Sequence, residues 1–314
     1  MEYFVGHLEK LGNKSLDESI PWGAEWWCAV ICELAHIIHP DRAGRRFMVV
    51  LTFKFDESYK DKRTLVVAGW IADDKQWERL ESRWQKAIAY ENKTLAPEYR
   101  IKRYHAAEMN AGDGPFRGWD EHRKHRLTNK LLKILSNGRM TAAGCGIDLN
   151  AFDELFPKRK PKDYAVAYII CMGTLLLSIA DEAKKEGGVR IAVIHDHGPW
   201  DRYALEGYNK WIDDDSWGMK DRFVGITSLT WGDDVGLQAA DLIAYESMRA
   251  IDNELWKPGA PMRYGLRQLL NSKVHVHGVY HDRKSLDVAA KFFKDKYGYK
   301  SGIQKIRQDD GDDT

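Results

Sequence analysis

The sequence predicts an α/β fold in which helices cover both faces of a central sheet. Short apolar runs alternate with longer helical patterns, an opening pair of strands is separated by a charged turn, and no repeat or Pro- or Ser-rich linker divides the 314 residues. With 44% hydrophobic and 30% charged residues, the chain can bury a substantial core. We therefore expect one domain with terminal extensions.

The first predicted elements form a hairpin followed by a helix. Residues 47–58 (FMVVLTFKFDES) form an apolar run that stops at its acids, and Thr64–Asp73 (TLVVAGWIAD) predicts a second strand. Residues 73–90 space their apolar side chains three and four apart, which predicts an amphipathic helix capped by Asp73 or Asp74. Residues 99–106 (YRIKRYHA) alternate and predict a further strand.

The middle of the chain continues the alternation. The stretch from Tyr164 is too uniformly apolar for a surface helix and too interrupted by charge for a membrane span, so we expect a central buried helix. The other predicted elements are a helix over 120–135, strands over 139–149, 187–198 and 221–230, a helix from about 235 to 251, and a C-terminal helix over 285–298.

These elements suggest three regions: a helical extension over residues 1–45, the main domain over 46–255, and a C-terminal extension over 256–314 with a helix and a short acidic tail. The apolar stretch 24–38 is too short for a bilayer span, and the N-terminus does not resemble a signal peptide. Lys and Arg number 48 against 47 Asp and Glu, so no overall field favours nucleic acid or a membrane. We expect a cytoplasmic protein with reduced cysteines and no membrane partner.

Three acids lie where apolar runs end or are interrupted: Asp56, Asp196 and Asp241. Asp241 is the most informative, because it lies on a helix that is apolar nearly all round and an unpaired buried charge is costly. A metal ion, a buried Arg or Lys, or a capping role would each satisfy it. The start of its own helix is too distant for capping.

Helical and strand periodicity select further candidates. Asp234, Gln238, Asp241 and Tyr245 share one stripe of the late helix, so Gln238 and Asp241 are expected to reach one site. On the first strand, Asp56 shares a face with Thr52 and Lys54, whereas Glu57 shares the opposite face. Asp56 is therefore a better candidate than Glu57.

Acids from two strands and a late helix predict a site for Mg²⁺ or Mn²⁺, hard ions that prefer carboxylate oxygen. Two such ions can activate water and stabilise the leaving oxygen in phosphodiester cleavage. The alternative is that these acids are simply solvated at strand ends and helix caps. Zinc binding by His275, His277 and His281 is a weaker possibility.

Several short motifs together resemble one family. They are FDES at 55–58, VVAGW at 66–70, HAAE at 105–108, HD at 195–196 and GLQAADLIA at 236–244. The chain from about Phe47 to Ala250 resembles the family called domain of unknown function 3800, which implies a ribonuclease H-like mixed sheet. The family's DES motif usually continues with Gly, whereas this chain has Tyr59, and its late motif is here Leu-Gln-Ala-Ala-Asp-Leu.

The resemblance implies a metal site with Asp56, Asp196 and Asp241 as ligands, completed by Glu57 or Glu108. His105 could then orient water as a base, with Glu108 as a fourth ligand. These two residues could equally be ordinary polar groups at a strand end.

The sequence thus favours a divalent-metal-dependent nuclease or phosphodiesterase, with nucleic acid bound through local basic runs: RIKRYH, EHRKHR and FPKRKPK. Two alternatives stay open. One is a non-catalytic module that binds nucleic acid or protein on the same fold, and the other is a hydrolase of small phosphorylated substrates.

Overall fold

The structure is a computed structural model that describes residues 50–60, 63–156, 164–185, 189–215, 217–230, 232, 234–257 and 259–297. The chain divides after Phe47 into two units, and the described residues belong to the second. The helical extension expected over 1–45, the basic loop at 158–162 and the acidic tail lie outside the described residues.

A six-stranded mixed sheet forms the centre of the described part, in the order β5-β4-β1-β2-β3-β6. β2 pairs antiparallel with β1 and β3, whereas β4 is parallel to β1, β5 to β4, and β6 to β3. The strands are β1 (Val50–Lys60), β2 (Thr64–Ala72), β3 (Thr141–Asp148), β4 (Arg190–Asp196), β5 (Phe223–Leu229) and β6 (His275–His281).

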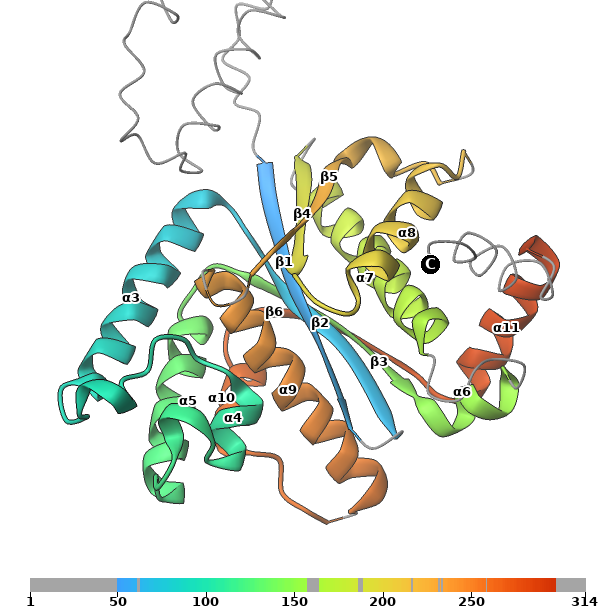
Figure 1. Ribbon diagram of the computed structural model, residues 1–314. Helices are drawn as coiled ribbons and strands as arrows, with labels where there is room; N and C mark the ends of the chain where they lie inside the picture. The colour runs from blue at the N-terminus through green and yellow to red at the C-terminus, as the bar shows by residue number, and fades with distance from the viewer. Residues whose placement is uncertain are drawn as a thin grey trace, which may run out of the picture. The chain divides into compact units, whose positions relative to one another are not determined.

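Helices cover both faces of this sheet, as the sequence predicts (Figure 1). One face carries α3 (Asp74–Asn92), α4 (Ala106–Ala111), α5 (Glu121–Ser136), α9 (Val235–Trp256) and α10 (Tyr264–Leu270). The other face carries α6 (Leu149–Leu155), α7 (Ala165–Lys185), α8 (Asp201–Ile212) and α11 (Arg283–Tyr297). The α/β class is therefore confirmed. Residues after 255 contribute α10, α11 and the edge strand β6.

Strand alternation divides the interior into two cores. Leu65 and Val67 of β2 pack toward α7, whereas Val66, Ala68 and Trp70 pack toward α9. Because a helix layer covers each face, every residue of β2 is buried. Charged groups near the middle of this sheet are consequently held away from water.

The first strand is longer than its sequence suggests. We expected the strand to stop at its acids, but β1 continues to Lys60, which pairs with Thr64 of β2. Asp56 therefore lies inside the strand rather than at its end. The antiparallel ladder explains the difference, because pairing with a fully buried neighbour outweighs the polarity of the residues Asp56–Ser58.

The strand predicted over 99–106 is wrong. Residues 100–105 have no regular secondary structure, and α4 begins at Ala106. Side chains satisfy this backbone in place of a neighbouring strand: Asn92 bonds both N and O of Ile101, and Gln238 accepts from Tyr104 N. We call residues 100–106 the strap.

The central helix is confirmed as a core element. α7 includes an apolar stretch, Ala165–Ala183, that is long enough by composition to cross a membrane, but 67% of its most apolar window is buried within the protein. It packs on β2, β3 and β4. A core helix buried on a sheet accounts for this apolar composition.

Candidate functional site

Asp56 and Asp196 lie on the same face of the sheet at adjacent strands. β1 and β4 are parallel and in register up to the pair Phe55 and His195, whose rings stack 5.8 Å apart on the α7 side. Because side chains alternate along a strand, the next residue of each strand turns to the α9 side. The topology therefore places these two carboxylates together.

Asp241 approaches the same place from α9, which packs over β1 and β2. Its side chain is buried, and burial raises its pKa well above the ordinary range. The negative charges of Asp56, Asp196 and Glu108 raise it further, which shows that the carboxylates are electrostatic neighbours. Together with Glu57, we call these five acids the carboxylate cluster.

The partner of Asp241 is a backbone amide. Its Oδ2 accepts a hydrogen bond of 2.6 Å from Ala106 N, the first residue of α4. We expected a metal, a basic side chain or a cap, and the sequence excluded only a cap on its own helix. Asp241 does act as a cap, on a short helix that begins 135 residues earlier in the chain.

The surroundings of Asp56 raise its pKa strongly. Burial and then the charge of Asp196 raise its pKa to about 7, although Oδ1 accepts a hydrogen bond of 2.8 Å from Glu57 N. Glu57 points to the opposite, α7 face, as alternation predicts. Burial, followed by the charges of Asp56 and Asp196, also raises the pKa of Glu57.

Gln238 holds the strap in place. Its Oε1 accepts hydrogen bonds from Tyr104 N at 3.0 Å and from Trp84 Nε1 at 3.2 Å. Asp241 holds the same strap one turn further along α9 through Ala106 N. Gln238 and Asp241 thus reach one segment together, and Gln238 acts there as a positioning residue.

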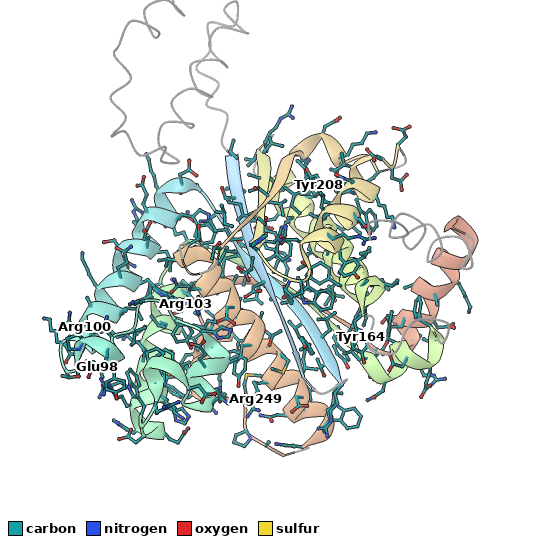
Figure 2. The ribbon with its side chains drawn as sticks, in the orientation of Figure 1. Glu98, Arg100, Arg103, Tyr164, Tyr208 and Arg249 are labelled. Atoms are coloured by element: carbon teal, nitrogen blue, oxygen red, sulfur yellow. The ribbon has the colours of Figure 1, made fainter. Side chains whose placement is uncertain are left out.

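The strap and α4 carry the two remaining candidates, His105 and Glu108, to the edge of the cluster. His105 Nδ1 lies 3.6 Å from Glu108 Oε1, and the two side chains are 34% and 31% exposed. Burial lowers the pKa of His105, Glu108 opposes this, and Arg103 reinforces it. His105 is consequently neutral at neutral pH and can accept a proton. Arg103 lies on the strap, nearer the sheet than Arg100 in this view (Figure 2).

The basic residue nearest to Asp56 in the sequence forms an ion pair with another acid. Lys54 shares the face of Asp56, but its Nζ lies 2.6 Å from Oδ2 of Asp234, the residue that caps α9. This ion pair fixes the start of α9 against β1. Lys54 is therefore paired with Asp234, while the acids of the carboxylate cluster raise one another's pKa values.

The donor set fits a hard divalent cation, because its members are carboxylates that raise one another's pKa values. In their present positions, however, no three His, Cys, Asp or Glu side chains among the described residues are arranged to hold a metal ion. Side-chain rotation would be needed to close the ligands around a cation.

One neighbour of the carboxylate cluster was not among the candidates selected from the sequence. Tyr168 of α7 is fully buried, and its hydroxyl has no hydrogen-bond partner among the described residues. Burial and then the charges of Glu57 and Asp56 raise its pKa. A single tyrosine in a uniformly apolar helix gave no reason to select it.

The weaker zinc candidates are not brought together as a metal site within the described residues. His277 pairs with Glu182 at 3.3 Å, and His281 contacts Thr174 at 2.9 Å. A cavity of about 260 Å³ between β3, β6, α9 and α10 is lined mainly by apolar side chains and by none of the seven candidate residues. The carboxylate cluster lies elsewhere.

Comparison with known proteins adds no classification. No protein-family model matches the chain, and no curated protein matches it. The interpretation of the site therefore depends on its own geometry and chemistry.

Proposed function

We propose that this protein is a divalent-metal-dependent phosphodiesterase, with a nuclease as the favoured form. The observation that carries the proposal is the convergence of Asp56, Asp196 and Asp241 from two adjacent parallel strands and the helix that covers them. The motifs FDES, VVAGW, HAAE, HD and GLQAADLIA support the proposal that the chain belongs to the domain of unknown function 3800 family. The mixed sheet is compatible with a ribonuclease H-like fold.

The three aspartates would hold Mg²⁺ or Mn²⁺, and Glu108 would complete the ligand set, because Glu57 points to the opposite face of the sheet. A cation bound there would supply activation of water and stabilisation of the leaving oxygen. Neutral His105 is available to accept a proton from an attacking water, and its contact with Glu108 orients the ring. Gln238 keeps the strap, and hence His105, at the correct distance from the aspartates.

The strap is the favoured basic element for a phosphate backbone. Lys102 and Arg103 are exposed on the segment that carries His105. The basic run on α5 is a weaker candidate, because Arg123 and Arg126 both pair with the buried Glu91. Those two arginines stabilise the α3–α5 packing and are partly neutralised.

A non-catalytic binding module is the second candidate. It is favoured by the absence, among the described residues, of three side chains already arranged to hold a metal. In that case the same fold and basic strap would bind a polyanion, and the acids would be protonated or solvated. Binding would then depend on salt and not on the metal.

The direct test measures Mn²⁺ binding by calorimetry for the wild type, Asp56→Ala and Asp196→Ala. A matched control is Glu254→Gln, which removes an exposed carboxylate from α9. We expect binding to wild type and control and none to the two aspartate variants. Equal affinity in all four proteins would exclude the site.

Activity is tested on labelled DNA, labelled RNA and a panel of small phosphodiesters. We expect Mn²⁺ to support cleavage that EDTA stops and that Asp56→Asn abolishes. Cleavage of the small diesters alone would indicate a small-molecule hydrolase. Salt-dependent polynucleotide binding that persists in Asp56→Asn and Asp196→Asn, without cleavage under any metal, would identify the binding module.

A further inference from the structure

A second group of reactive side chains lies between β3, α7 and β6, on the face of the sheet opposite to the one that Asp56, Asp196 and Asp241 share. It contains Cys145 of β3, Cys171 and Thr174 of α7, and His281 at the end of β6, and we call it the thiol cluster. Both cysteines are free and fully buried. They lie in two elements that the sequence predicts, the strand over 139–149 and the central helix.

Strand register brings the members together. Cys145 and Ile147 of β3 lie opposite Val279 and His281 of β6, so Cys145 and His281 share the face that α7 covers. Cys171 Sγ lies 3.6 Å from the carbonyl oxygen of Cys145 and donates to it. This hydrogen bond places the Cys171 side chain against the backbone of Cys145.

The hydrogen bonds of Thr174 determine the protonation of His281. Its hydroxyl donates its one proton to Ile170 O at 3.0 Å, so the contact of 2.9 Å with His281 requires that Nε2–H donates to Thr174 Oγ1. Nδ1 of His281 is then the free acceptor, and it has no hydrogen-bond partner of standard geometry among the described residues. A base is thus held beside the Cys145 thiol.

The pKa values of the two thiols are shifted in opposite directions. Burial alone would raise the pKa of Cys145, but interactions with Cys171, His281 and Thr174 lower it to about 6. Burial and the neighbouring Cys145 raise the pKa of Cys171 instead. Cys145 is therefore the nucleophilic thiolate, and Cys171 remains a thiol that can react with it afterwards.

We propose that Cys145 and Cys171 form a reversible dithiol–disulfide site that reacts with hydroperoxides, with His281 as its base. The Cys145 proton passes to Nδ1 of His281, the thiolate attacks one peroxide oxygen, and the O–O bond breaks. Cys145 becomes a sulfenic acid, and the departing hydroxide takes the proton from His281 to form water.

In the second step the sulfur of Cys171 attacks the sulfur of Cys145, and the S–O bond breaks. The hydroxide leaves with the Cys171 proton as a second water. Two thiols are oxidised and one hydrogen peroxide is reduced to two waters. The product links β3 to α7 across one face of the sheet.

The position in the sheet allows a small oxidant to approach. Among the described residues β6 is the edge strand, so Cys145 lies one strand from that edge of the sheet. Gly144 and Gly146 flank Cys145, and the opposing residues of β6, Gly278 and Val279, are exposed. Since both sulfurs are buried, we expect the reaction to be slower than at a surface thiol.

The experiment treats the folded full-length chain, with Cys28 and Cys32 replaced by Ser, with hydrogen peroxide. We expect an intact-mass loss of about 2 Da, a Cys145–Cys171 linked peptide, and reversal by dithiothreitol. Cys171→Ser should give instead a Cys145 sulfenic acid that dimedone traps. Circular dichroism before treatment verifies that each variant is folded.

His281→Gln tests the base, and His277→Gln is the matched control on the same strand and face. We expect His281→Gln to slow bridging by about threefold or more, a modest factor because a more basic thiolate is also more nucleophilic. His277→Gln should react like the parent. Failure of a folded parent to bridge, or equal rates in the two histidine variants, would overturn the proposal without affecting the phosphodiesterase site.

Discussion

Two polar clusters lie in the same sheet, and they balance charge in different ways. In the carboxylate cluster, acids with like charge converge from β1, β4 and α9 and raise one another's pKa values. In the thiol cluster, an acid and a base face each other, so the proton of Cys145 can move to His281. The like charges of the first cluster favour the binding of a cation or of protons, whereas the second cluster is neutral as a pair.

This difference predicts that the unfolding free energy depends on pH, and this is the largest effect that we expect. The pKa of Asp56 rises from 3.8 to about 7 on folding, so between these values the folded chain binds more protons than the unfolded chain. Unfolding free energy should therefore fall as pH rises through this window, by about 4 kcal/mol at most for this group. The check is denaturant unfolding at pH 4 to 8 with EDTA.

Asp56→Asn should reduce this slope, since the amide does not titrate, while Glu57 and Asp241, whose pKa values are also raised, continue to contribute. Asp196→Asn should reduce it, because Asp196 is the second cause of the raised pKa. Saturating Mn²⁺ should stabilise the wild type most at the upper end of the range, where the acids are ionised. A wild-type slope that is the same in Asp56→Asn would show that Asp56 is not the titrating group.

A smaller effect separates the two roles of Asp241. Asp241→Asn keeps an oxygen for Ala106 N and removes a negative charge, so its melting temperature in EDTA should equal or exceed that of wild type. Asp241→Ala leaves this buried amide without an acceptor and should be less stable than Asp241→Asn by about 1–3 kcal/mol. Thermal unfolding of both variants measures the difference. Equal stability would show that the bond to Ala106 contributes nothing.

The sequence predicted the strands and helices that carry Asp196 and Asp241 because their periodicity is local. It could not predict the strap, since the groups that bond Tyr104 and Ala106 lie on α9, more than a hundred residues later. The predicted end of β1 was wrong for a similar reason. The strand continues because Lys60 pairs with Thr64 of β2, and this pairing is not visible in the local sequence of β1. The sequence could not identify Tyr168 as a neighbour of the carboxylate cluster, because its environment depends on which strands α7 covers.

A local prediction tests how the edge of the carboxylate cluster is built. Gly114 has a φ of +56°, and a Cβ there would lie 3.2 Å from Glu108 Oε2. Gly118 has a φ of +79° with nothing within 4 Å of its Cβ position. Gly118→Ala should therefore cost only left-handed strain, about 1–2 kcal/mol, whereas Gly114→Ala should also displace Glu108.

The readout for this glycine pair is unfolding free energy together with the pKa of His105 from NMR titration. Because Glu108 favours the charged imidazole, its displacement in Gly114→Ala should lower the pKa of His105. Gly118→Ala should leave that pKa unchanged. An equal pKa in both variants would mean that the methyl group added by Gly114→Ala does not displace Glu108.

The smallest expected effect is the most specific to the thiol cluster. Folding lowers the pKa of Cys145 to about 6 and raises that of His281 above 6.5. Taken alone, Cys145 would add stability as pH rises from about 6 towards 9, and His281 would remove stability as pH rises through its folded pKa.

Between about pH 6.5 and the folded pKa of His281, the folded pair holds one proton on His281 and the unfolded pair holds one on Cys145. The proton counts cancel, so replacing Cys145 by Ser should leave the pH dependence of unfolding free energy in that interval nearly unchanged, in contrast to Asp56→Asn. A clear change of slope in the cysteine variant would show that Cys145 exchanges its proton with solvent and that His281 is not its partner.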